Sequence, residues 1–112
     1  MYHYKCKVLN VVDGDTVDVE FDLGFRFKMI DRIRLYGINA PELRSSIIEE
    51  RCAAVDARRR LIELCVGVDS IRTQLDKRDK YGRMLGSLYI GDNVVSVNET
   101  LVAEHHAKEY ML

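Results

Sequence analysis

The chain has 112 residues, of which 47% are hydrophobic and 31% are charged, and its formal net charge is −1. These values predict one soluble globular domain over residues 1–112, and they exclude a disordered chain or one with a segment apolar enough to cross a membrane. A net charge near zero argues against a large non-specific nucleic-acid platform, because such proteins are strongly basic. The first residues contain no apolar secretion segment, so we expect a cytoplasmic protein.

Alternating apolar and polar residues predict three strands in the first third of the chain. Val17, Val19 and Phe21 would share one face of a strand, and Asp13-Gly14 is a typical turn before it. Asp31-Arg32 marks an expected bulge or bend inside a longer third strand. The expected strands of this part cover 4–12, 16–22 and 25–38.

A helix, two further strands and a closing helix are expected next. Ser46-Ile47-Ile48-Glu49 matches a capping box, which predicts a helix that begins at Ser46. Its buried side would carry four residues at helical spacing, namely Ala54, Ala57, Leu61 and Leu64. The later elements are expected as strands over 66–75 and 83–90, joined by a loop over 76–82, and a helix over 97–110. Five strands with a helix after the third are the order of an OB-type barrel.

The chain has three cysteines, Cys6, Cys52 and Cys65, whose spacing matches no zinc or redox motif. We expect all three to be reduced and buried as small hydrophobic side chains.

Three groups of polar and charged residues exceed what the structure of a small β-domain requires. They are Asp13-Gly14-Asp15-Thr16 at a turn, Arg34 with Asn39-Ala40-Pro41-Glu42, and Asp79-Lys80-Tyr81-Gly82-Arg83. Each group alone is typical of a turn, a surface arginine or a polar hairpin. A curled barrel could bring all three to one rim. There, carboxylates could hold a hard cation and arginines could neutralise the charge of a phosphate.

In this order, the segments resemble the staphylococcal nuclease (thermonuclease) family. The resemblance rests on 11–16, 34–42, 79–83 and 97–102 and covers nearly the whole chain. It implies a five-stranded OB-fold (SNase-like) barrel with a helix after strand three and a C-terminal helix. It also implies a calcium-dependent phosphodiesterase that cuts DNA and RNA with little sequence preference.

The resemblance implies a metal site as well. The expected ligands are Asp15, Asn39 and the backbone carbonyl of Ala40, with Asp13 supporting them. The family pattern has an aspartate where this chain has Asn39. An amide oxygen can still bind calcium, but one negative charge is lost. We therefore expect weaker calcium binding, or the use of another divalent cation.

The remaining roles implied by the resemblance concern the substrate. Glu42 would activate or orient the attacking water, while Arg34 and Arg83 would bind the phosphate and stabilise the transition state. Lys80 and Tyr81 would contact the nucleotide.

Two other functions stay open at this point. A catalytically weak or inactive SNase-like module could bind nucleic acid or a protein partner, as Asn39 and a shortened loop after Glu42 would favour. An OB-fold interaction module without a nucleic-acid role is the third reading, and it treats the charged positions as coincidence. The sequence predicts no particular oligomeric state.

Overall fold

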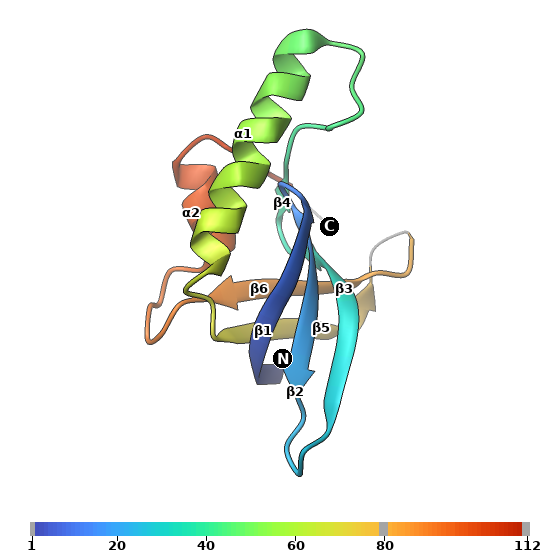
Figure 1. The fold of residues 1–112 in the computed structure, drawn as a ribbon, viewed down its shortest axis with the longest axis vertical. Coiled ribbons are helices and arrows are strands. Elements are labelled where there is room, and N and C mark those ends of the chain that lie inside the picture. Colours follow the sequence, from blue (N-terminus) through green and yellow to red (C-terminus); the bar gives the residue numbers. More distant parts are fainter. Residues whose placement is uncertain (1, 79–80, 111–112) are drawn as a thin grey trace.

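Five strands close into a barrel, as the alternation of apolar and polar residues predicts. The computed structural model describes residues 2–78 and 81–110. The barrel strands are β1 (Tyr2–Asp13), β2 (Thr16–Asp22), β3 (Lys28–Leu35), β5 (Ser70–Arg78) and β6 (Met84–Tyr89). They pair in the order β1-β2-β3-β6-β5, and β5 returns to β1 to close the barrel (Figure 1). The predicted OB-type barrel is confirmed.

One pairing in the barrel is parallel, and it joins segments far apart in the sequence. β3 runs beside β6, with Ile33 opposite Met84 and Arg34 opposite Leu85. The other pairs of barrel strands are antiparallel. The parallel pair places the beginning of β6, and with it Arg83, beside the end of β3.

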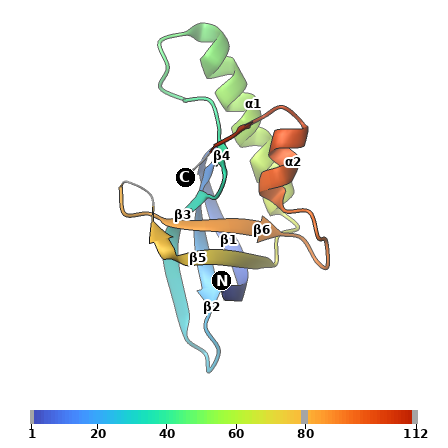
Figure 2. The same cartoon turned by 180° about the vertical axis from the view of Figure 1, so that it is seen from behind.

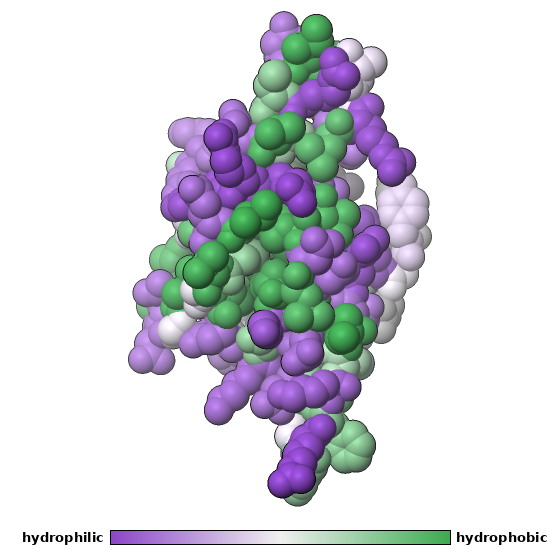
Figure 3. All heavy atoms as spheres, in the orientation of Figure 1, coloured by the Kyte–Doolittle hydropathy of each residue, from purple (hydrophilic) through white to green (hydrophobic). Residues whose placement is uncertain are grey.

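The core lies inside the barrel and below two helices. Val17, Val19 and Phe21 of β2 are fully or almost fully buried, as their shared face predicts. Helix α1 (Ile48–Cys65) buries Ala54, Ala57 and Leu61, and α2 (Val97–Ala103) buries Val97 and Leu101. Both helices lie at one end of the barrel, and the β2–β3 hairpin extends from the other end (Figures 1 and 2). Hydrophobic side chains also follow α1 on its outer side (Figure 3).

The helix predicted from Ser46 begins two residues later, at Ile48. The hydroxyl of Ser45 accepts a bond from the Ile47 amide and donates to Glu50, so this serine rather than Ser46 organises the entry to the helix. The same sequence pattern does form a capping box at Ser96 and Glu99, at the start of α2.

The predicted bulge at Asp31-Arg32 is wrong. β2 and β3 pair without interruption from Asp22 and Lys28 to Thr16 and Arg34. The irregularities lie instead in β1, where the register shifts between Val8 and Asn10 and again before Asp13. The third strand is also shorter than predicted, because residues 25–27 form the hairpin turn and Gly37 turns the chain before a separate strand, β4 (Ile38–Asn39).

The fourth barrel strand begins at Ser70 rather than at Val66. The amides of Gly67 and Val68 bond to the carbonyls of Leu64 and Cys65, so the chain continues to turn after α1 before it extends.

The closing helix ends at Ala103 instead of continuing to Tyr110. His105 has a left-handed φ of +63°. Its amide bonds to Val102, and the amide of His106 bonds to Leu101, which together form a Schellman motif. The residues that follow form β7 (Lys108–Glu109), which pairs with β4.

We expect His105→Gly to raise the free energy of unfolding by about 0.5 to 1 kcal/mol. A left-handed conformation costs a residue with a side chain roughly 1–2 kcal/mol, and the greater freedom of glycine in the unfolded chain offsets part of this gain. Urea denaturation measures the change. His106→Gly is the matched control because His106 has no positive φ, and this variant should be destabilised. An equal rise in both variants would contradict this account of the helix end.

The cysteine prediction holds only in part. Cys6 and Cys65 are free and half-buried, but Cys52 is free and exposed on α1. The described helices include none with the length and apolar character needed to cross a membrane.

Candidate active site

The turn between β1 and β2 is held tightly in place. The Asp13 carboxylate accepts a bond from the Asp15 amide at 3.1 Å, which shapes the turn. A Cβ atom on Gly14 would lie 2.8 Å from the Cβ of Ala40 and 2.9 Å from that of Ala57. Only a glycine allows the turn to approach both α1 and the segment after β4 this closely. The position of Asp15 is therefore fixed by packing.

Asp15 is buried and connects three segments of the chain. One carboxylate oxygen accepts a bond from the Ala40 amide at 2.8 Å, and the other accepts from the Thr16 hydroxyl at 3.1 Å. The carbonyl of Asp15 accepts from the Leu35 amide at 2.8 Å. Thr16 was not among the predicted site residues, although it stands beside Asp15 in the sequence.

The guanidinium group of Arg34 lies beside this carboxylate. Its Nη1 lies 3.4 Å from Oδ2 of Asp15 and donates to the carbonyl of Leu35 at 3.1 Å. Its Nη2 donates to Oδ1 of Asn39 at 3.1 Å. Arg34 is buried, whereas Asn39 is exposed at the edge of the group. We refer to Asp15, Thr16, Arg34, Asn39 and Ala40 together as the Asp15 cluster.

The environment of Asp15 opposes its negative charge. Burial, and after it the neighbouring Asp13 carboxyl, raise the pKa of Asp15 from its ordinary 3.8 to about 6. The Ala40 amide and the Arg34 guanidinium act in the opposite direction but do not cancel these effects. Two carboxyl groups that lie this close together favour a proton or a cation between them.

Glu42, Tyr81 and Arg83 are the predicted substrate-contacting residues that the structure describes besides Arg34. Glu42 is exposed, two residues beyond Ala40. Arg83 is half-buried directly before Met84, and its guanidinium lies 5.4 Å from the ring centre of the exposed Tyr81. Lys80 lies outside the described residues. The fold thus brings Asp15, Arg34, Asn39 and Ala40 into contact, leaves Glu42 two residues beyond Ala40, and places Arg83 directly before the strand that pairs with β3.

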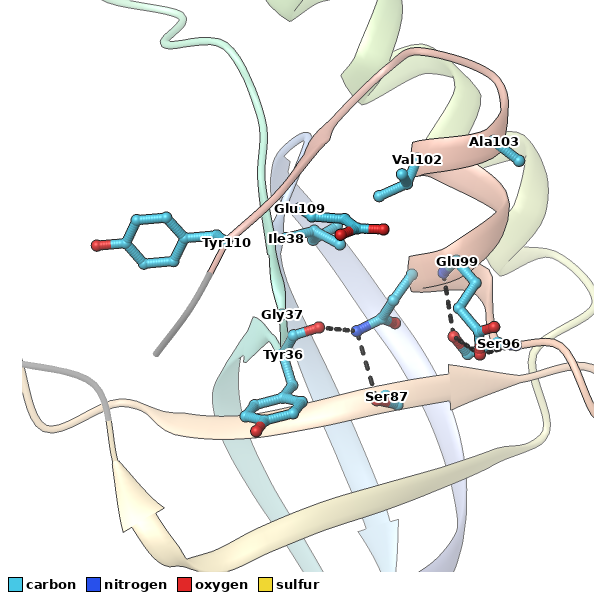
Figure 4. A pocket seen from close by; sticks show the side chains of 11 residues that line it. Tyr36, Gly37, Ile38, Ser87, Ser96, Glu99, Val102, Ala103, Glu109 and Tyr110 are labelled. Atoms are coloured by element: carbon cyan, nitrogen blue, oxygen red, sulfur yellow. Dashed lines mark hydrogen bonds between the residues drawn. The ribbon is translucent and has the colours of Figure 1, made fainter.

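A separate groove of about 790 Å³ lies between the β3–β4 turn, β6, α2 and β7. Tyr36 and Tyr110 stand on one side of it, and Glu99, Val102 and Ala103 of α2 stand on the other (Figure 4). None of the predicted site residues that the structure describes lines this groove. No sequence motif marked it, because its lining comes from four separate elements.

The residue types in and beside the Asp15 cluster are ones that a hard cation can use as ligands. Two carboxylates (Asp13 and Asp15), the Asn39 amide oxygen and the Ala40 carbonyl are all oxygen ligands of the kind that calcium prefers. Within the described residues, no group of three or more His, Cys, Asp and Glu side chains could hold a metal ion. A cation here would therefore depend on neutral oxygens as well as on carboxylates.

We expect the fold to gain stability between pH 7.5 and pH 5 in the presence of a chelator. The folded protein binds a proton on Asp15 more tightly than the unfolded chain does, so stability rises as the pH falls through about 6 towards 3.8. The full effect is at most about 3 kcal/mol, because one pH unit of pKa difference is worth 1.36 kcal/mol. Urea denaturation across this range measures the gain. Asp15→Asn should remove most of the slope, and a slope that persists in this variant would assign it to another group.

Comparison with known proteins gives relatives named as endonucleases. The chain is 35% identical over 102 residues to the SPbeta prophage-derived endonuclease YokF of Bacillus subtilis (strain 168), an alignment that covers 87% of this chain and 31% of that protein. It is 32% identical over 96 residues to an uncharacterized endonuclease of Escherichia coli O157:H7, covering 86% of this chain and 54% of that protein.

A third relative is Protein ParB of Escherichia coli, which is 33% identical over 93 residues that cover 80% of this chain and 44% of ParB. The chain thus spans between about a third and just over half of the length of these relatives. The family described as Staphylococcal nuclease homologue matches residues 32–112, which include the second half of β3 and all later elements of the barrel. With this match over most of its length, and with the barrel that carries the Asp15 cluster, the chain belongs to the staphylococcal nuclease family.

Proposed function

We propose that this chain is a metal-dependent nuclease domain that hydrolyses phosphodiester bonds of DNA, RNA or both with little sequence specificity. The observation that supports this proposal is the contact of Asp15, Arg34 and Asn39, which come from a turn and two strands. The endonuclease names of two relatives support it as well. Calcium is the first candidate cation. Another divalent ion is the second, because the Asn39 amide carries no charge.

In this proposal, Asp15, Asn39 and the carbonyl of Ala40 hold the cation, and Asp13 supports Asp15. When bound, such an ion lowers the pKa of a water molecule and stabilises negative charge on phosphate oxygens. Glu42 is exposed close to Ala40, and it accepts a proton from the attacking water or orients it.

Arg34 and Arg83 act on the phosphate. A guanidinium presents five N–H donors in a planar fork, which suits two oxygens of one phosphate. Arg34 now lies against Asp15 and Asn39. A cation held by Asp15 would compete with Arg34 for this carboxylate, and the guanidinium of Arg34 would then be available to bind the phosphate. Because these residues would contact the phosphate rather than the edges of the bases, little sequence preference is expected.

A plasmid-nicking assay tests the proposal. The folded protein, checked by circular dichroism, is incubated with supercoiled DNA and with calcium, magnesium or manganese in turn, and also with chelator. Cleavage that requires a divalent cation is expected. If the folded protein cleaves neither DNA nor a single-stranded RNA with any of these ions, it is not a nuclease domain of this kind.

One observation favours a second candidate function, a module that binds nucleic acid or a protein partner without cutting. Arg34 bridges Asp15 and Asn39 and so completes the cluster without a cation. For nucleic acid, this function predicts binding of single-stranded DNA that chelator and Glu42→Gln leave unchanged, with no cleavage. For a protein partner, it predicts neither cleavage nor such binding. A cleavage activity that Glu42→Gln abolishes would exclude both forms.

We expect Asn39→Asp to lower the cation concentration needed for half-maximal cleavage roughly tenfold, since calcium affinity follows the charge of the ligands. Cleavage at low calcium should rise accordingly. Asn93→Asp is the matched control, because Asn93 is an exposed asparagine in a turn away from the cluster. Equal cation dependence in the parent and in Asn39→Asp would place residue 39 outside the metal site.

A further inference from the structure

Helix α1 carries a second apolar face in addition to the one that it buries. Ile48 is 64% exposed, Val55 is 55% exposed and Ile62 is 41% exposed, although all three are large aliphatic residues. Cys52 and Val66 are exposed on the same side. A helix packed only on its own barrel would carry polar residues at these positions.

This face lies opposite the core. Successive residues of an α-helix turn by about 100°, which places Ile48, Val55 and Ile62 on the side of α1 opposite Ala57, the centre of its buried face. Figure 3 shows hydrophobic side chains along α1 on the visible side of the molecule. This face is therefore turned away from the core and is open to a partner.

The spacing of the face is that of a coiled coil. Its positions follow one another in alternate steps of four and three residues, the repeat by which two helices pack side by side. We call this row the α1 seam, and its members are Ile48, Cys52, Val55, Arg59, Ile62 and Val66.

The charges that flank the seam are arranged in a way that suits a second copy of the same helix. One flank is acidic at intervals of seven residues, with Glu49, Asp56 and Glu63. The other flank carries the exposed Arg51 and, seven residues on, the half-buried Arg58, whose Nε also donates to the Val11 carbonyl at 3.2 Å. Charges beside the seam set the partner and the orientation of paired helices. In a parallel pair each basic flank meets an acidic one, whereas in an antiparallel pair like charges meet.

We propose that two copies of this chain associate as a homodimer through their α1 seams, with the two helices parallel. Arg51 then faces Asp56 of the partner subunit, and the pair occurs twice because of the two-fold symmetry. Cys52 lies close to Cys52 of the partner subunit across the axis. The two barrels lie on the outside of the helix pair.

Arg59 is the polar member of the seam, and its position is compatible with this arrangement. Its guanidinium pairs with Asp56 one turn earlier on the same helix, so the charge lies at the flank while the apolar stem covers the seam. A single polar residue in such a seam fixes the register at some cost in stability. The helix has 18 residues and a length of about 27 Å, so a weak, concentration-dependent dimer is expected.

Sedimentation equilibrium of the full chain over a wide range of concentration tests the association. We expect a monomer–dimer equilibrium whose dissociation constant rises at least about tenfold in Val55→Glu, because a tenfold change corresponds to 1.4 kcal/mol. Val94→Glu is the matched control, because Val94 is an exposed valine before α2, and it should leave the equilibrium unchanged. A chain that stays monomeric throughout, or a dimer that Val55→Glu leaves intact, would overturn the proposal.

Oxidation of the thiols tests the orientation. Burial raises the pKa of Cys6 and of Cys65 to about 12, so both stay protonated at pH 8, whereas Cys52 is exposed. We expect a disulfide-linked dimer on mild oxidation, and its loss in Cys52→Ser. A non-covalent dimer in which Cys52 fails to cross-link would contradict the parallel arrangement.

Charge reversal on α1 tests the orientation of the two helices independently and needs no cysteine. In a parallel dimer, Arg51→Glu opposes Asp56 of the partner subunit and weakens association several-fold, and the double variant Arg51→Glu with Asp56→Arg restores it. In an antiparallel dimer, Arg51→Glu would instead remove a repulsion and strengthen association. This second result would overturn the proposed geometry while leaving the nuclease proposal untouched.

Discussion

Replacing Arg83 by alanine is expected to lower the turnover of DNA cleavage by about 10²-fold or more, the scale on which preorganised charge stabilisers contribute. The concentration of cation for half-maximal activity should change little, because Arg83 acts on the phosphate and not on the metal ligands. Steady-state cleavage of a labelled oligonucleotide at several calcium concentrations separates the two quantities. Arg83→Lys should recover only part of the loss, since lysine lacks the planar fork.

Arg83 is a cleaner test than Arg34. Arg34 is buried against Asp15 and Asn39, so its removal would also leave a buried carboxyl without its cationic neighbour and would lower stability. Arg83 is half-buried and stands directly before the start of β6.

Arg26→Ala is the matched control for Arg83→Ala, because Arg26 lies in the β2–β3 hairpin, at the end of the barrel that points away from the helices. Similar losses in both variants would mean that Arg83 contributes only general attraction to nucleic acid. A loss confined to Arg83 that also shifts the cation requirement would assign it to the metal site instead.

The barrel strands were predictable because the pattern that marks each strand lies within a few consecutive residues. Period-two alternation marks β2 residue by residue, and Val17, Val19 and Phe21 are buried as that pattern requires. The parallel contact of β3 with β6 was not predictable in this way. It joins Ile33 to Met84 across α1 and β5, and no pattern within either strand specifies a partner so far along the chain.

Helix ends show why local signals sometimes fail. Ser46 and Ser96 stand in the same S-x-x-E pattern, yet only Ser96 forms the capping box. Before α1, the pairing of Ser45 with Glu50 competes with that pattern and fixes the chain earlier. At the end of α2, His105 takes a left-handed conformation that usually belongs to glycine, so sequence preference favours continuing the helix.

The candidate site was predictable as a set of residues but not as a set of contacts. Motif order named Asp15, Arg34 and Asn39, and the fold brings these three into one cluster. The closeness of Gly14 to Ala57, which fixes that turn against α1, depends on tertiary packing. The burial that raises the pKa of Asp15 has the same origin and cannot be read from neighbouring residues.

Asn98 connects α2 to β6 and to the turn after β3. Its removal is expected to have the largest effect on stability. Its side chain is buried at the start of α2. The amide nitrogen donates to the carbonyls of Tyr36 at 2.9 Å and of Gly86 at 3.1 Å, and the amide oxygen accepts from the Leu88 amide at 3.2 Å. One side chain thus bonds to three backbone groups, of which the Gly86 carbonyl also accepts from the Tyr36 amide at 2.8 Å.

We expect Asn98→Ala to lower the free energy of unfolding by roughly 2–5 kcal/mol, because the Tyr36 carbonyl and the Leu88 amide lose this partner and each buried backbone group left without one costs about 1–3 kcal/mol. This is a large share of the 5–15 kcal/mol that stabilises a typical domain. Asn98→Asp should not rescue the protein, since a carboxylate keeps the acceptor but brings a negative charge against two carbonyls. Urea denaturation with both variants and with Asn10→Ala, an exposed asparagine, measures the difference.

The same substitution should disturb the candidate site, and this links the fold to the proposed chemistry. Tyr36 follows directly after β3 and leads through Gly37 into β4, which carries Asn39. When Asn98 no longer holds the Tyr36 carbonyl, the chain between Arg34 and Ala40 loses its anchor to α2. Cleavage by Asn98→Ala, measured well below its unfolding midpoint, should therefore need more cation than cleavage by the parent. If cleavage per folded molecule and cation requirement both stay unchanged, Asn98 stabilises the domain without positioning the Asp15 cluster.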